Sequence, residues 1–114
     1  MSRLTFLSAL LASAVTAQAA AQCVQPGMVV VPDGRSATLE EMLEAQTAVR
    51  TFLADMEEFL TCINEEIDAQ PDETPQEVRA ALIERHNAGV TEMETVAARF
   101  NEQRIAYQQA HPSQ

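Results

Sequence analysis

The stretch "TLEEMLEAQTAVRTFLADMEEFLTCINEEID", residues 38–68, carries the signals of one long amphipathic helix. Thr38, followed three residues later by Glu41, makes a capping box, a common mark of a helix start. Apolar residues then recur at steps of three and four, and only Gln46 breaks the series. These residues are Leu39, Met42, Val49, Leu53, Met56, Leu60, Ile63 and Ile67. The pattern predicts helix 1 over residues 39–69.

A second helix is predicted over residues 75–108. Thr74, Pro75 and Glu77 give a second capping box with proline at the first helical position. A row at helical spacing follows: Val78, Leu82, His86, Gly89, Met93, Val96, Phe100, Gln103 and Tyr107. A parallel row runs through Ile83, Val90 and Ala97. Residues 39–108 therefore predict an all-α domain of two amphipathic helices.

The turn at residues 70–74 is so short that the helices can only fold back antiparallel, as a coiled-coil-like hairpin. This arrangement predicts the following neighbours: Ile63 with Leu82, Met56 with Gly89, Val49 with Val96, and Gln46 with Phe100 and Gln103. This pairing explains the glycine at position 89, because a residue without a side chain lets the backbone of helix 2 approach Met56, Phe52 or Phe59 of helix 1. A simple kink at Gly89 is the alternative. Residues 109–114 are expected to form a flexible tail.

Residues 1–21 read as a secretory signal peptide. Arg3 precedes an apolar run over residues 4–15, and small residues follow in an A-x-A arrangement. Cleavage after Ala19 or after Ala21 fits equally well. The apolar run is shorter than the roughly 20 residues that span a bilayer. We therefore expect a periplasmic or secreted protein without membrane insertion.

Export favours a disulfide between the only two cysteines, Cys23 and Cys62. Separate thiols, a bridge between molecules and half of a metal site are the alternatives. A disulfide would tie an extended N-terminal arm, residues 22–38, along helix 1. Its fifteen residues after Cys23 can reach about 50 Å, against about 35 Å from Cys62 back to the helix start. Leu43, Phe52 and Phe59 lie beside the predicted helix contact, and the segment 28–31 could then cover the two phenylalanines.

The chain is acidic, with 17 acids against 7 bases and no lysine. Loss of Arg3 with the signal would move the formal charge from −10 to −11. Between Glu40 and Glu77 Arg50 is the only base, so helix 1 presents a negative outer face. Binding to nucleic acid or anionic lipid is thus disfavoured, and cationic partners are favoured. A purely solubilising role of the charge is the alternative.

The sequence offers no catalytic, cofactor or metal site that we would assign, so we expect a protein that is not an enzyme and uses no cofactor. His86 falls on the helix contact, where it reads as a core or boundary side chain. The carboxylates lack the spacing of a calcium-binding EF-hand loop. A group of them marks a possible interaction face: Glu57, Glu58, Glu65, Glu66 and Asp68.

Residues 32–62, "PDGRSATLEEMLEAQTAVRTFLADMEEFLTC", resemble a group of small exported bacterial proteins of unknown function. The shared features are a lead rich in Cys and Pro, a P-D-G turn, an A-T-x-E-E-M helix start and a second Cys. The resemblance implies a location in the periplasm or outside the cell and supplies no activity. We expect a non-enzymatic interaction or structural component of the envelope, with a homodimeric four-helix bundle as one form. The alternative is an acidic, chaperone-like or inhibitory binder of cationic peptides or metal ions.

Overall fold

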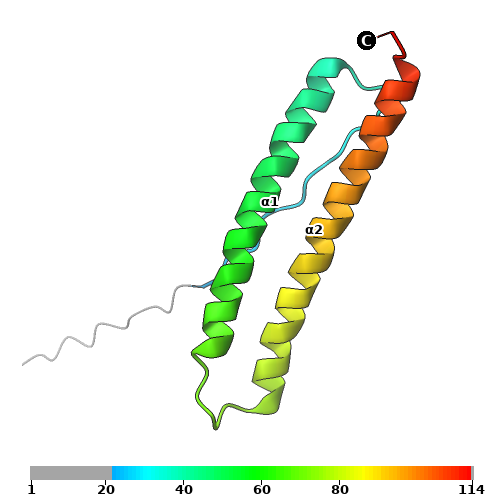
Figure 1. The fold of residues 1–114 in the computed structure, drawn as a ribbon. Helices are drawn as coiled ribbons and strands as arrows, with labels where there is room; N and C mark the ends of the chain where they lie inside the picture. Colours follow the sequence, from blue (N-terminus) through cyan, green and yellow to red (C-terminus); the bar gives the residue numbers. More distant parts are fainter. Residues whose placement is uncertain (1–21, 114) are drawn as a thin grey trace, which may run out of the picture.

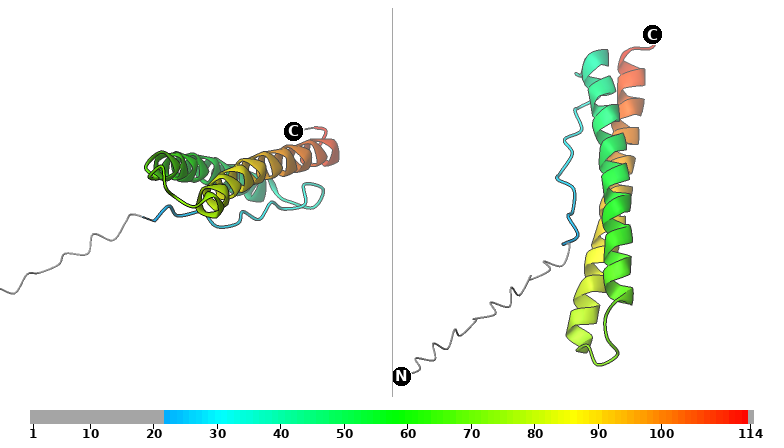
Figure 2. Two further views of the ribbon diagram at one scale, coloured as in Figure 1. Left: turned by 90° about the horizontal axis from the view of Figure 1, so that it is seen from below. Right: turned by 90° about the vertical axis from the view of Figure 1, so that its left-hand side faces the viewer.

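A computed structural model describes residues 22–113, and the predicted signal peptide lies outside this range. The described chain is an all-α hairpin of α1 (Leu39–Asp68) and α2 (Gln76–Ala110). The helices lie antiparallel and side by side (Figure 1). The arm, residues 22–38, runs without regular structure along one side of the helix pair (Figure 2). The predicted fold class is confirmed.

The capping box at the start of α1 is confirmed. The Glu41 amide donates to Thr38 Oγ1 at 3.1 Å, and the Thr38 amide donates to Glu41 Oε2 at 2.7 Å. Two amides that would otherwise lack an acceptor in the first turn are thereby satisfied. α1 ends at Asp68, one residue earlier than predicted.

The second capping box is wrong. α2 begins one residue later than predicted, Pro75 occupies the cap position, and no side chain caps the helix. Thr74 belongs instead to the preceding turn, where its amide donates to the Pro71 carbonyl at 3.0 Å. The Arg79 guanidinium reaches back to the carbonyls of Gln70 and Pro71. The turn between the helices is thus stabilised by the side chain of Arg79 in α2 rather than by a capping side chain.

Buried residues of α1 alternate steps of three and four along its length: Met42, Ala45, Val49, Phe52, Met56, Phe59 and Ile63. α2 contributes Leu82, Gly89, Val96 and Tyr107. A methyl group built on Gly89 would lie 2.9 Å from Leu60 Cδ2, 3.2 Å from Met56 Sδ and 3.4 Å from Phe59 Cε1. The predicted approach of the helices at Gly89 is confirmed.

The buried row of α1 is rotated relative to the predicted one. Phe52 and Phe59 are only 3% and 2% exposed, whereas Leu53 and Leu60 are half-buried. Leu39, predicted in the helix contact, is 54% exposed. The rotation follows from the arm, because it covers one flank of α1 and leaves the other flank open to solvent.

Cys23 and Cys62 form the predicted disulfide, with a Cα–Cα distance of 5.6 Å. Beyond the disulfide, successive side chains of the arm point alternately toward the helices and toward solvent, as in an extended chain. Val29 and Val31 pack on the core cluster that contains the phenylalanines, while Met28 and Val30 are 87% and 86% exposed. The prediction that residues 28–31 cover the phenylalanines therefore holds only for the two inward-facing valines.

The arm also reaches α2, which the sequence did not predict. Gln25 Nε2 donates to Glu92 Oε2 at 2.8 Å, and the Gly34 amide donates to Gln103 Oε1 at 2.9 Å. A methyl group on Gly34 would lie 1.9 Å from the Gln103 carbonyl oxygen, so only glycine fits this approach. Gln103 therefore holds the arm, and its pairing with Gln46 stays a prediction.

The far end of the hairpin has its own small core. Ala37 of the arm, Met42 of α1 and Tyr107 of α2 are buried together. α2 continues to Ala110, and the His111 ring stacks on Tyr107 with centroids 4.2 Å apart. The predicted flexible tail, residues 109–114, thus starts too early, because the last turn of α2 supports the stacked pair.

Candidate functional site

The predicted interaction face does not form one continuous surface. Glu57, Glu65 and Asp68 are exposed. Glu58 is also exposed but lines a hollow beside the disulfide. Glu66 is half-buried, with Oε2 lying 3.5 Å from Cys23 Sγ. The acidic residues of α1 therefore spread around the helix, and their binding role stays a prediction.

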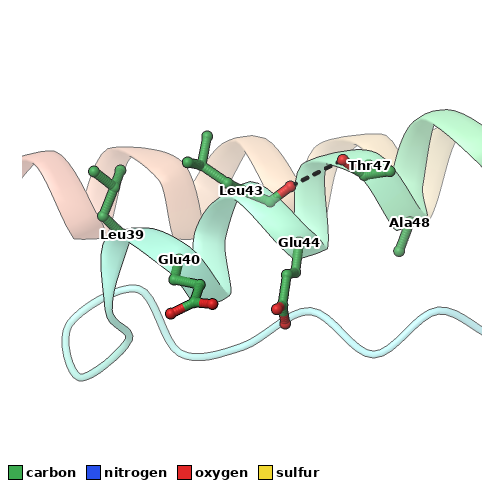
Figure 3. A pocket seen from close by; sticks show the side chains of 6 residues that line it. All are labelled: Leu39, Glu40, Leu43, Glu44, Thr47 and Ala48. Carbon is green, nitrogen blue, oxygen red and sulfur yellow. Dashed lines mark hydrogen bonds between the residues drawn. The ribbon is translucent and has the colours of Figure 1, made fainter.

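A more localised surface lies at the start of α1. Leu39 and Leu43 are 54% and 53% exposed. They line an open hollow together with Glu40, Glu44, Thr47 and Ala48 (Figure 3). In this view the two leucines point to one side of the helix, and the two carboxylates point to the other side, toward the arm. We call Leu39 and Leu43 the leucine ridge.

The ridge also borders a second hollow, which lies between the start of α1 and the end of α2. Its lining residues are Leu39, Met42, Leu43, Gln46, Phe100, Arg104, Tyr107 and Gln108. The ridge therefore separates two depressions, and an apolar side chain of a partner could enter either one. Exposed apolar side chains next to concave surface are typical of sites that bind protein.

The charges around the ridge are asymmetric. Glu40 and Glu44 are exposed, and neither pairs with an arginine within residues 22–113. Arg104, on the side of α2, donates to Asn101 Oδ1 at 2.8 Å. We call the first hollow, lined by Leu39, Glu40, Leu43, Glu44, Thr47 and Ala48, the outer hollow. It is therefore negative, and a ligand with basic groups beside an apolar group would match it.

The hydroxyl group in the wall of this hollow is satisfied within the helix. Thr47 Oγ1 donates to the Leu43 carbonyl at 3.2 Å (Figure 3). This bond leaves the outer hollow with apolar walls and a carboxylate rim. Binding here would rest on apolar contact and charge rather than on directed hydrogen bonds.

Sequence reasoning missed the ridge because the apolar spacing placed Leu39 in the helix contact. The opposing segment of α2 gave a usable signal. Gln103, Arg104 and Gln108 are polar, so this end of α2 cannot form an apolar contact as wide as that at Gly89. Leu43 was predicted to lie beside the helix contact, and it stays exposed because the arm covers the other flank of α1.

The other groups considered from the sequence lie apart from the ridge. His86 is half-buried along the helix contact. Within residues 22–113 no three His, Cys, Asp or Glu side chains are placed to hold a metal ion, and neither α1 nor α2 has an apolar window that could cross a bilayer.

The chain matches no protein-family model, and comparison with curated proteins and with solved structures finds no match.

Proposed function

We propose that this protein is a non-enzymatic interaction component of the bacterial envelope, and that it docks its partner on the leucine ridge. The observation that carries the proposal is the exposure of Leu39 and Leu43, each more than half in water between two hollows. About half of each side chain is already covered, so burying the remainder in an interface contributes about 1 kcal/mol each by transfer.

Location in the periplasm or outside the cell is part of the proposal. The disulfide between Cys23 and Cys62 is compatible with an oxidising compartment. The signal-like residues 1–21 and the resemblance of residues 32–62 to small exported bacterial proteins favour the same location. Export would deliver the chain to the place where its disulfide can form.

The charge of the site favours a cationic, amphipathic partner segment. Glu40 and Glu44 flank the apolar walls of the outer hollow, and the described chain provides no base to neutralise them. A segment with an apolar residue beside lysine or arginine would fill the hollow and meet both carboxylates. Steering by these charges acts mainly on the association rate, and salt weakens it.

The test is capture from envelope extract on the oxidised protein, with binding to each variant quantified. Leu43→Glu should reduce capture of the bound component at least about tenfold, because it places a charge in the contact. Val30→Glu is the matched control, since it makes the same kind of change at an 86% exposed valine on the arm. Glu40→Gln with Glu44→Gln should weaken capture and reduce its salt dependence.

Equal loss of capture in Leu43→Glu and Val30→Glu would refute a specific ridge. Capture that survives Leu43→Glu unchanged would also refute it. Circular dichroism at 222 nm should show that each variant keeps the helix content of the unmodified protein.

A further inference from the structure

The hairpin has a second face, opposite the arm, that the fold leaves uncovered. Figure 2 shows the arm on one side of the helix pair only. We call the face on the other side the open face. By helical spacing from Phe52 and Phe59, which lie on the arm side, residues spaced by seven on each helix fall on it. Those of α1 are Leu39, Gln46, Leu53, Leu60 and Ile67, and those of α2 are Ile83, Val90 and Ala97.

The two faces differ in burial although both are rich in apolar residues. On the arm side, Phe52 and Phe59 are 3% and 2% exposed. On the open face, Leu53 and Leu60 are half-buried and Ile83 is 48% exposed. The open face thus resembles one half of a helical bundle, in which a further layer would complete the burial.

The α1 row is symmetric about its central member. A two-fold axis through Leu53, perpendicular to the helices, would set α1 antiparallel to α1 of a second copy. Gln46 would then face Leu60 of the second copy, and Leu39 would face Ile67. Each position meets one from its own row, which is the self-complementarity that an isologous two-fold interface requires.

Charges on the same face follow the same symmetry. Arg50 lies three residues before Leu53 and Glu57 lies four residues after it, so Arg50 of each copy would face Glu57 of the other. Arg50 is the single base between Glu40 and Glu77. Both side chains are exposed, and neither has an ion-pair partner within residues 22–113. The pairing would give two equivalent salt bridges across the axis.

The second helix fits the same axis. Gly89 is level with Met56, so the level of Leu53 falls near residue 92 of α2. Antiparallel pairing about that level would put Val90 beside Met93 of the second copy and Ile83 beside Phe100. Met93 and Phe100 are half-buried in the hairpin, and they would gain apolar neighbours.

The size of the open face is sufficient for a stable pair. The 30 residues of α1 span about 45 Å at 1.5 Å per residue. Two packed helices are roughly 20 Å wide. The face is therefore about 900 Å² per copy, close to the roughly 800 Å² per partner of a stable protein interface.

We infer that the protein forms an antiparallel homodimer through the open face, a four-helix bundle with Leu53 on the two-fold axis and Arg50 opposite Glu57 of the second copy. The inference does not need the partner proposed for the leucine ridge, but the dimer would take up Leu39 and cover the hollow between α1 and α2. A partner of the dimer would therefore bind at Leu43 and the hollow beside Glu40 and Glu44. In the dimer each arm stays on an outer surface, and the outer hollow at Glu40 and Glu44 stays accessible.

The first test is cross-linking at the axis in the full exported chain. Leu53→Cys should form a disulfide-linked dimer under mild oxidation, because the two new thiols would meet across the axis. Thr51→Cys is the matched control, since Thr51 lies on the same helix and is exposed away from the open face. We expect the Leu53→Cys dimer to form at least about tenfold faster.

The second test uses the salt bridges and reads the mass by sedimentation equilibrium. Glu57→Arg should raise the dimer dissociation constant about tenfold at low salt, since two opposite-charge contacts become like-charge contacts. Arg50→Glu combined with Glu57→Arg should return the constant to within about threefold of the unmodified protein. Such rescue is not expected if either change acts only on the fold of one copy.

A monomer mass for the unmodified oxidised protein at about 0.1 mM would overturn the inference. Equal cross-linking rates for Leu53→Cys and Thr51→Cys, or a charge exchange that fails to rescue Glu57→Arg, would overturn the register. The ridge proposal is tested separately, by the effect of Leu43→Glu on capture. A monomer whose capture of the partner still depends on Leu43 would refute the dimer and leave the ridge proposal in place.

Discussion

Removing the disulfide should destabilise this domain more than any other single covalent change. Cys23 and Cys62 are 39 residues apart in sequence. In the chain-entropy model, closing a loop of about 40 residues disfavours the unfolded state by about 4 kcal/mol at 25 °C. We expect replacement of both cysteines by serine to lower the free energy of unfolding by about that amount.

The loss is large relative to what a chain of this size can have. At about 0.05 to 0.15 kcal/mol per residue, the described range 22–113 corresponds to roughly 5 to 14 kcal/mol. For a domain of this size each kcal/mol shifts the melting temperature by about 4 to 8 °C. The serine variant should therefore melt about 15 to 30 °C below the oxidised protein.

The assay is thermal unfolding followed by circular dichroism at 222 nm, with the oxidised protein, the reduced protein and the double serine variant side by side. The reduced protein is the control, because it lacks the bridge but keeps both sulfur atoms. It should melt within a few degrees of the serine variant. A serine variant that melts within about 5 °C of the oxidised protein would show that the bridge does not stabilise the fold in this way.

Three further predictions use the same melting assay. Gly34→Ala should destabilise the protein by at least about 2 kcal/mol, because the new methyl group meets backbone atoms of α2 at 1.9 Å and 2.8 Å; a melting temperature equal to that of the unmodified protein would contradict this close approach. Gly89→Ala should lie within about 1 kcal/mol of the unmodified protein, since the gain in helix propensity offsets contacts that end on the mobile tips of Leu60 and Met56. A larger loss would mean that the helices cannot adjust there. Deletion of residues 110–114 should lower the melting temperature by about 4 to 8 °C, because it removes the ring that stacks on Tyr107; an unchanged value would show that this stacking is not maintained in solution.

Much of the fold could be predicted because its determinants are local in sequence. The capping box at Thr38, the apolar spacing and the short turn each restrict the chain over a few residues, and together they give an antiparallel hairpin. The disulfide followed from the count of two cysteines and the signal-like start of the chain. The approach at Gly89 followed from counting residues back from the turn.

The flank of α1 that the arm covers could not be predicted from the same spacing. Phe52 and Leu53 are adjacent and similarly apolar, so either could complete the helix contact. The choice is made by residues more than twenty positions away: Cys23, Val29 and Val31 pack on the phenylalanine side. The alternation of the arm itself was predictable, since an extended chain turns successive side chains to opposite sides.

The leucine ridge was missed for a different reason. Helical periodicity assumes that the contact continues to the end of both helices, whereas the last turns of α2 present Gln103, Arg104 and Gln108. The role of Gly34 was also hidden, because a turn signal such as P-D-G explains a glycine without reference to a distant helix. Both features depend on the register between elements, which the sequence specifies only indirectly.

The arm is bonded covalently to α1 at Cys62 and through hydrogen bonds to α2 at Glu92 and Gln103. It therefore crosses the line along which the two helices would separate. For α2 to swing away, the arm must release its contacts in the same event, so opening of the hairpin and loss of the arm form one cooperative transition. Amide protons in the middle of α1 and of α2 should consequently exchange with solvent at similar rates, and only the helix ends should exchange sooner.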